Sequence, residues 1–104
     1  MPERFRVKAS LKAQHDVARI HDCIAADKPF AARKWYRGFA RHARSLQRLP
    51  YRYEEIPEAD ELGLPLRHII FGNYRIFYLV SEDAVDIIRV IHAARALRRE
   101  MFEN

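Results

Sequence analysis

Three apolar segments near the C-terminus, separated by two short polar turns, restrict the fold of this chain more than any other feature of its sequence. Residues 66–71 and 74–80 flank Gly72-Asn73, a dipeptide typical of a two-residue hairpin turn. The turn SEDA then leads into the third segment, residues 85–92. We therefore predict an antiparallel three-stranded meander, with the most continuously apolar segment, 74–80, in a central position.

The first half of the chain predicts one strand followed by two helices. Apolar and basic residues alternate at 4–8, which is typical of a short half-buried strand. Ser10 is a suitable N-cap for a helix over 11–26. Pro29 fits the first turn of a second helix over 29–48, because its missing N–H is not needed there. The very short connection predicts an antiparallel helical hairpin.

Together these segments predict a single α+β domain spanning residues 1–104. Residues 49–65, with three prolines and Gly63, are expected to form an irregular loop, in which the acidic residues form a solvated stretch. Residues 93–104 are expected to form a short or frayed C-terminal segment. The order β-α-α-β-β-β places a helical hairpin on one face of a twisted, mostly antiparallel four-stranded sheet.

The expected register of the meander gathers several polar side chains. Counting from the turns pairs Phe77 with Ile88 and Arg75 with Val90. Because side chains alternate along a strand, one sheet face then ends in a polar cluster. The cluster consists of His68, Arg75 and His92, with Arg95 just beyond the strand. Guanidiniums bind phosphate oxygens and imidazoles exchange protons near neutral pH, so this is either an RNA-cleaving site or an ordinary half-solvated sheet face.

Basic residues are concentrated in the second predicted helix. The chain has a formal net charge of +5, and residues 28–52 include eight basic side chains and no acidic one. Five arginines recur at helical spacing and form a basic stripe, namely Arg33, Arg37, Arg41, Arg44 and Arg48. The stripe indicates either a surface for an acidic partner, such as nucleic acid or an acidic protein segment, or a solvated helix face.

Composition disfavours several functional classes. Cys23 is the only cysteine, which excludes an intramolecular disulfide and is typical of a reducing cytoplasm. The three glycines form no phosphate-binding loop, and His15 and His21 lack the spacing of metal ligands. No signal peptide is recognisable, and no apolar run reaches the roughly 20 residues of a membrane span. We expect a cytoplasmic protein without metal, cofactor or membrane association.

The C-terminal half resembles a known family. The stretch GNYRIFYLVSEDAVDIIRVIHAAR, residues 72–95, is similar to the C-terminal signature of the RelE/ParE superfamily. These proteins are bacterial toxins of type II toxin–antitoxin modules, often described as plasmid stabilisation proteins. The motifs DVARIHDCIA and KPFAARKW agree with the two helices of that superfamily, so the resemblance covers about residues 5–98. It implies the same fold as the one predicted above.

The two branches of this superfamily imply different roles for the same residues. RelE-like members are ribosome-dependent mRNA endonucleases. In that case His92 or His68 is the expected acid/base, while Arg75 and Arg95 hold the scissile phosphate. ParE-like members poison DNA gyrase by binding it and have no catalytic residues of their own. The expected target contacts are then Arg75, His92, Arg95, Arg98 and Arg99.

Two features favour the ParE-like branch. The late tyrosine or histidine of RelE-like members falls near Met101 and Phe102, neither of which exchanges a proton. The strand ending RVIHAAR is also more similar to ParE. A third alternative is a toxin homologue that has lost its toxicity and only binds antitoxin.

All three alternatives imply the same partner. A cognate antitoxin is expected to lay an acidic, partly disordered C-terminal segment over this chain and to fold on binding. The basic stripe from Arg33 to Arg48 is the expected landing surface, and the complex is expected to be a toxin–antitoxin hetero-oligomer. The expected target is DNA gyrase, with ribosome-bound mRNA as the alternative.

Overall fold

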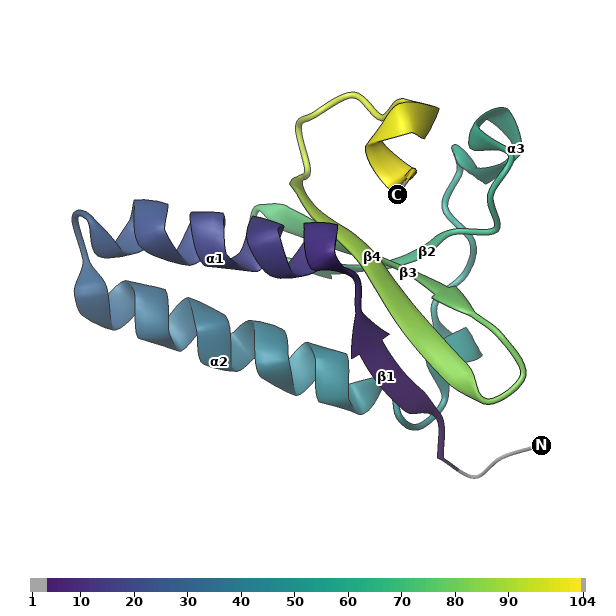
Figure 1. Ribbon diagram of the computed structural model, residues 1–104, viewed down its shortest axis with the longest axis horizontal. Helices are drawn as coiled ribbons and strands as arrows, with labels where there is room; N and C mark the ends of the chain where they lie inside the picture. Colours follow the sequence, from purple (N-terminus) through teal and green to yellow (C-terminus); the bar gives the residue numbers. More distant parts are fainter. Residues whose placement is uncertain (1–3, 104) are drawn as a thin grey trace.

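A computed structural model describes residues 4–103 and confirms the predicted order of the major elements (Figure 1). The strands and long helices are β1 (Arg6–Ala9), α1 (Leu11–Ala25), α2 (Pro29–Ser45), β2 (Arg67–Phe71), β3 (Tyr74–Val80) and β4 (Ala84–His92). Three short helical pieces are η1 (Pro50–Arg52), α3 (Ala59–Leu62) and η2 (Arg99–Phe102). The helix α2 ends at Ser45 rather than at the predicted residue 48, so Arg48 lies in the turn that follows it.

The sheet has the strand order β1-β4-β3-β2, and the two long helices pack on one side of it as predicted. The edge strand β1 runs parallel to β4, whereas the pairs β2–β3 and β3–β4 are antiparallel. The helices α1 and α2 lie side by side, with their connecting turn at the end remote from β1 (Figure 1). This is the mostly antiparallel sheet with a helical hairpin that the sequence predicts.

Local signals set the beginnings of both long helices. The hydroxyl of Ser10 accepts the amide of Ala13 at 3.0 Å, and so caps α1. The same hydroxyl donates to the carbonyl of Ile88 on β4 at 2.8 Å, which ties the start of the helix to the sheet. Pro29 occupies the first turn of α2, as predicted.

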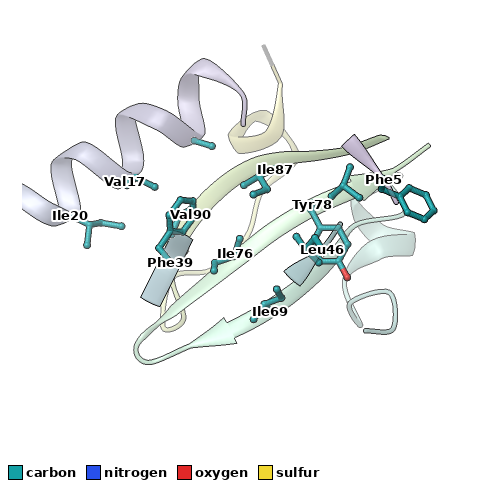
Figure 2. Packing of buried hydrophobic residues seen from close by; sticks show 12 residues of the cluster. Phe5, Val17, Ile20, Phe39, Leu46, Ile69, Ile76, Tyr78, Ile87 and Val90 are labelled. Carbon is teal, nitrogen blue, oxygen red and sulfur yellow. The ribbon is translucent and has the colours of Figure 1, made fainter. Parts of the chain in front are cut away.

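The larger hydrophobic core lies between the sheet and the two long helices (Figure 2). It includes Val17, Ile20, Phe39, Leu46, Ile69, Ile76, Tyr78, Ile87 and Val90. The hydroxyl of the fully buried Tyr78 donates to the carbonyl of Pro50 at 2.6 Å. Burial raises the pKa of Tyr78 to about 12, so the phenol stays protonated and anchors the chain that follows α2.

A smaller core covers the opposite face of the sheet. It is formed by Ile56, Ala59, Leu62, Leu66, Phe77, Ile91, Met101 and Phe102. The ring of Phe102 meets that of Phe77 edge-on, with the ring centroids 5.1 Å apart. The C-terminal segment predicted at 93–104 is therefore short, as expected, but it is not simply frayed, because two of its side chains are buried in this core. Met101 and Phe102 anchor η2 through contacts that are distant in the sequence.

The register between β3 and β4 matches the prediction near the turn, where Val80 lies opposite Val85, but differs from it by one residue farther along the strands. Phe77 lies opposite Arg89 instead of Ile88, because a β-bulge leaves Ile88 as an extra residue in β4. Side chains of β4 beyond the bulge therefore point to the face opposite to the predicted one. As a result, Val90 belongs to the larger core and Ile91 to the smaller core.

A buried ion pair joins α1, β4 and the C-terminal turn. Asp16 on α1 is 3% exposed and accepts two hydrogen bonds from Arg89, from Nε at 2.7 Å and from Nη2 at 2.9 Å. The same carboxylate accepts the backbone amide of Val90 at 3.0 Å. Arg89 donates its third nitrogen, Nη1, to the carbonyl of Met101 at 2.6 Å. Hydrogen bonding to Asp16 raises the pKa of Arg89, so the guanidinium stays charged.

The substitution Asp16→Asn should lower the free energy of unfolding by about 3–5 kcal/mol, because it leaves the guanidinium of Arg89, whose side chain is only 13% exposed, without a counter-charge. Urea unfolding followed by circular dichroism measures this change as a lower midpoint with an unchanged m-value.

Asp83→Asn is the matched control for this measurement. Asp83 pairs with Arg6 at 3.2 Å, but both side chains are mostly exposed. Loss of this exposed pair should change the stability by no more than about 1 kcal/mol. Equal effects of the two substitutions would contradict the role assigned to Asp16.

Candidate functional site

The structure brings together two of the four residues predicted to form one polar cluster. Arg75 on β3 donates from Nε to Nδ1 of His68 on β2 at 2.9 Å. Both side chains lie near the ring of Phe77, on the face that carries the smaller core. The guanidinium carbon of Arg75 is 4.7 Å from the centre of that ring, a cation–π contact. The other two residues, His92 and Arg95, belong to a different site.

Glu58, which lies in the predicted solvated acidic stretch, completes the site around Arg75. Its carboxylate accepts from both terminal nitrogens of Arg75, with Nη1–Oε2 and Nη2–Oε1 distances of 3.2 Å each. This is the bidentate geometry in which an arginine also binds phosphate. Since Nε is held by His68, all three guanidinium nitrogens of Arg75 have partners, and the residue is 9% exposed.

Charge and burial set the protonation states of this site. Hydrogen bonds from Arg75 hold the pKa of Glu58 below its ordinary value, against the opposing effect of burial. Burial, followed by the positive charge of Arg75, lowers the pKa of His68. At neutral pH the site therefore contains a carboxylate, a guanidinium and a neutral imidazole that accepts a hydrogen bond. The ion pair leaves little positive charge for a phosphate group.

A second site lies at the other face, where β4 ends. His92 lies opposite Tyr74, with the ring centroids 5.4 Å apart, and Arg95 follows in the next turn. Together with Arg19 and Cys23 of α1, these residues line a small surface pocket. Arg19 and Cys23 were not predicted to be functional. Their spacing of four places them on one side of the helix, but only tertiary packing shows that this side adjoins β4.

The bulge at Ile88 is the reason that His92 is separated from His68 and Arg75. The prediction placed Val90 opposite Arg75, whereas Ile91 occupies that position. The side chain of His92 is therefore on the face of Tyr74, which packs against the larger core. The predicted four-residue cluster is thus wrong as a single site.

The remaining predicted target contacts, Arg98 and Arg99, lie at the beginning of η2 and are exposed. Arg98 pairs with Glu100 at 3.8 Å, and Arg99 with Glu103 at 4.0 Å. Exposed pairs of this kind are weak and easily exchanged. Both guanidiniums are therefore accessible to a binding partner.

The predicted basic stripe is exposed along its whole length, with Arg33, Arg37, Arg41 and Arg44 on α2 and Arg48 in the turn after it. None of the ion pairs formed within residues 4–103 involves these arginines. A groove between the long helices is lined mostly by apolar side chains, with three polar ones among them: Ala9, Val17, Ala18, Tyr36 and Phe39, and Gln14, His21 and Asp22. The stripe and groove offer adjoining basic and apolar surfaces.

Two kinds of site find no support in the part of the chain that the structure describes. Across residues 4–103, no three histidine, cysteine or carboxylate side chains are grouped so that they could hold a metal ion. No helix in the same range combines the length and apolar character needed to cross a membrane.

Comparison with known proteins assigns the chain to a family. Residues 7–97 match the model of the ParE toxin of the type II toxin–antitoxin system parDE. The chain belongs to the ParE toxin family. A solved chain from the chromosomal ParDE system of P. aeruginosa is similar to this chain, with a TM-score of 0.70 and 17% sequence identity. The match covers 88% of this chain and 98% of that chain, and it confirms the fold. No curated protein sequence shows a significant match.

The partly buried, neutral His68 should make this chain less stable as the pH falls. Its pKa in the folded state lies below the ordinary value of 6.5. The unfolded state therefore binds a proton more readily than the folded state does. The stabilising contribution of neutral His68 to the free energy of unfolding is complete above about pH 6.5 and is lost as the pH falls through the folded-state pKa. Urea midpoints measured across this range should fall less steeply in His68→Gln, because an amide does not titrate.

The lowered pKa of Glu58 also makes the stability fall with pH, but in a separate window below its ordinary value of 4.5. The two contributions can therefore be distinguished by the pH at which they are lost. Identical slopes for the wild-type chain and His68→Gln between neutral and mildly acidic pH would contradict the assignment to His68.

Proposed function

We propose that this ParE-family chain is a toxin that binds DNA gyrase, traps the complex of gyrase with cleaved DNA and so blocks replication. Family membership supports the toxin role. The proposed contact surface comprises His92, Arg95, Arg98 and Arg99, which are exposed at and beyond the end of β4. Action by protein binding is favoured over RNA cleavage by the arrangement around Arg75.

The ion pair between Arg75 and Glu58 is the observation on which this choice depends. A RelE-type nuclease needs guanidiniums that hold the scissile phosphate and stabilise its additional negative charge in the transition state. The terminal nitrogens of Arg75 are instead held by a carboxylate of the same chain. We therefore assign Arg75 a structural role and remove it from the proposed target contacts.

The C-terminal turn supports the same conclusion. Met101 and Phe102, which stand near the position of the late proton-exchanging residue in RelE-like enzymes, are buried in the smaller core. Neither side chain exchanges a proton, and both are occupied in packing. The separation of His92 from Arg75 also divides the four-residue cluster into two pairs, His68 with Arg75 and His92 with Arg95, so neither site combines all the groups of the nuclease interpretation.

The purified chain should inhibit supercoiling by gyrase and increase the amount of cleaved DNA bound to the enzyme. Arg95→Ala should weaken this effect about tenfold, which corresponds to one charge-assisted contact of about 1.4 kcal/mol. Arg6→Ala is the control, because Arg6 is an exposed arginine on β1 and belongs to none of the proposed surfaces. Supercoiling gels and quantification of linear DNA provide the two measurements.

Two other results would assign a different role. Normal supercoiling in the presence of the chain, together with codon-specific cuts in translated mRNA after induction, would establish the RelE-like endonuclease. Harmless overexpression in the absence of antitoxin would establish a chain that only binds antitoxin.

The proposed antitoxin surface is the basic stripe of α2 together with the groove beside it. The exposed guanidiniums, which form no ion pair within residues 4–103, suit an acidic segment, while Tyr36 and Phe39 in the groove suit its apolar side chains. An antitoxin segment that folds along α2 would use both. The basic stripe predicted from the sequence is therefore proposed as the landing surface of the antitoxin.

Simultaneous reversal of Arg37, Arg41 and Arg44 to glutamate should weaken binding of the cognate antitoxin by about a hundredfold or more, because like charges then face each other. The stability of the isolated chain should change by no more than about 1 kcal/mol, since the three side chains are exposed. Isothermal titration calorimetry and urea unfolding measure the two effects. The same variant should still inhibit gyrase, and an unchanged antitoxin affinity would rule out the stripe as the landing surface.

A further inference from the structure

The pocket at the end of β4 combines hydrogen-bond donors and positive charge. Arg19 and Cys23 come from α1, Tyr74 from the first position of β3, and His92 and Arg95 from the end of β4 and the turn after it. The residues that line the pocket all lie within the described part of the chain, and none of them is an aspartate or glutamate. The pocket is therefore suited to an anion.

His92 presents a hydrogen-bond donor at this pocket. Its Nδ1 accepts the backbone amide of Ala94 at 3.1 Å, so the proton of the neutral ring is on Nε2. The edge-to-face contact with Tyr74 holds the ring in place, with an interplanar angle of 77°. The backbone amide of Arg95 donates to the carbonyl of His92 at 3.0 Å, which closes the turn. The backbone thus fixes the positions of His92 and Arg95 relative to each other.

The positive charge at the pocket is only partly compensated. Arg19 lies 3.5 Å from Asp16, but that carboxylate already accepts two shorter hydrogen bonds from Arg89. Two guanidiniums therefore share one carboxylate, and the side chain of Arg19 is 65% exposed. Arg95 takes part in none of the ion pairs formed within residues 4–103. Both Arg19 and Arg95 are available to a ligand.

We propose that this pocket binds one phosphate group of a DNA backbone. Two guanidiniums, an imidazole N–H and a phenol O–H are donors that a phosphodiester accepts. The exposed Arg98 and Arg99 extend the positive charge along the chain toward neighbouring phosphates. This proposal rests on the proposed gyrase function in one respect: the DNA would be the duplex that gyrase holds.

The pocket is distinct from the surface proposed for the antitoxin. Arg19 and Cys23 lie on the side of α1 that adjoins β4, whereas His21 and Ala18 line the groove toward α2. An acidic segment that follows the stripe on α2 leaves the pocket accessible. For this reason we assign the pocket to DNA rather than to the antitoxin.

Cys23 provides a direct measure of whether the pocket is occupied. It is the only cysteine of the chain, and it is exposed at the pocket. The experiment measures the rate at which iodoacetamide alkylates Cys23 in the full chain, with and without a short DNA duplex. At a duplex concentration about ten times the Kd, the rate should fall about tenfold, because only about a tenth of the protein remains free. Mass spectrometry follows the modified fraction over time.

Matched variants test which residues hold the DNA. Arg95→Ala and Arg19→Ala should lose most of the protection, while Arg6→Ala, which removes the same charge near the opposite end of β4, should keep it. Each variant is judged by its ratio of rates with and without DNA, so that a change in the intrinsic reactivity of the thiol cancels. Arg95→Ala should also reduce the slope of the logarithm of the duplex-binding constant against the logarithm of the salt concentration by about one, which corresponds to one lost phosphate contact.

Inorganic phosphate, compared with sodium chloride at equal ionic strength, should protect Cys23 more weakly than the duplex does. The proposal is overturned if the duplex binds without slowing alkylation, if phosphate protects and the duplex does not, or if single-stranded RNA protects more strongly than DNA. Gyrase inhibition by the same preparation separates the two proposals. Protection without inhibition retains the pocket and rejects the gyrase target, whereas inhibition without protection rejects the pocket alone.

Discussion

The carboxylate of Asp16 stabilises an edge of the sheet that the short strand β1 leaves uncovered. β1 pairs with β4 only as far as Ile87, so the backbone of β4 beyond that point has no strand beside it on this edge. The hydroxyl of Ser10 donates to the carbonyl of Ile88, and Asp16 accepts the amide of Val90. The first turns of α1 thereby replace the missing strand. A buried backbone group without a partner is costly, which explains why the helix lies along this edge.

The same carboxylate makes an arginine tolerable within an otherwise apolar strand. The bulge at Ile88 brings Arg89 opposite Phe77, and the guanidinium then bonds both to Asp16 and to the carbonyl of Met101. Its charge is compensated and all three of its nitrogens have partners. The C-terminal turn is held against the smaller core by this contact. The bulge also turns the end of β4, which moves its histidine away from the centre of the predicted cluster.

The parts of the fold that depend on local signals could be predicted from the sequence. The Gly72-Asn73 turn, the Ser10 cap and the apolar periodicity of the helices each act within a few residues, and each appears where expected. The bulge could not be predicted in this way, because Arg89 and Asp16 are separated by 73 positions. The packed C-terminal turn is a similar case. A segment with so few apolar residues gains order only from a sheet face that the tertiary fold presents.

Part of the candidate site could be predicted for the same reason. His68 and Arg75 are diagonal neighbours on one face of a hairpin, whereas Glu58 reaches them from a loop whose acidic residues show no periodic pattern. Yet that carboxylate compensates the charge of Arg75, which is then not available to a binding partner. Glu58 and Asp16 neutralise the arginines of the sheet interior. The arginines along α2 and after β4 are exposed, and so the positive charge of this chain is available on two separate surfaces. Two such surfaces would allow the proposed acidic antitoxin and the proposed DNA-bound target to be recognised by different residues of one small domain.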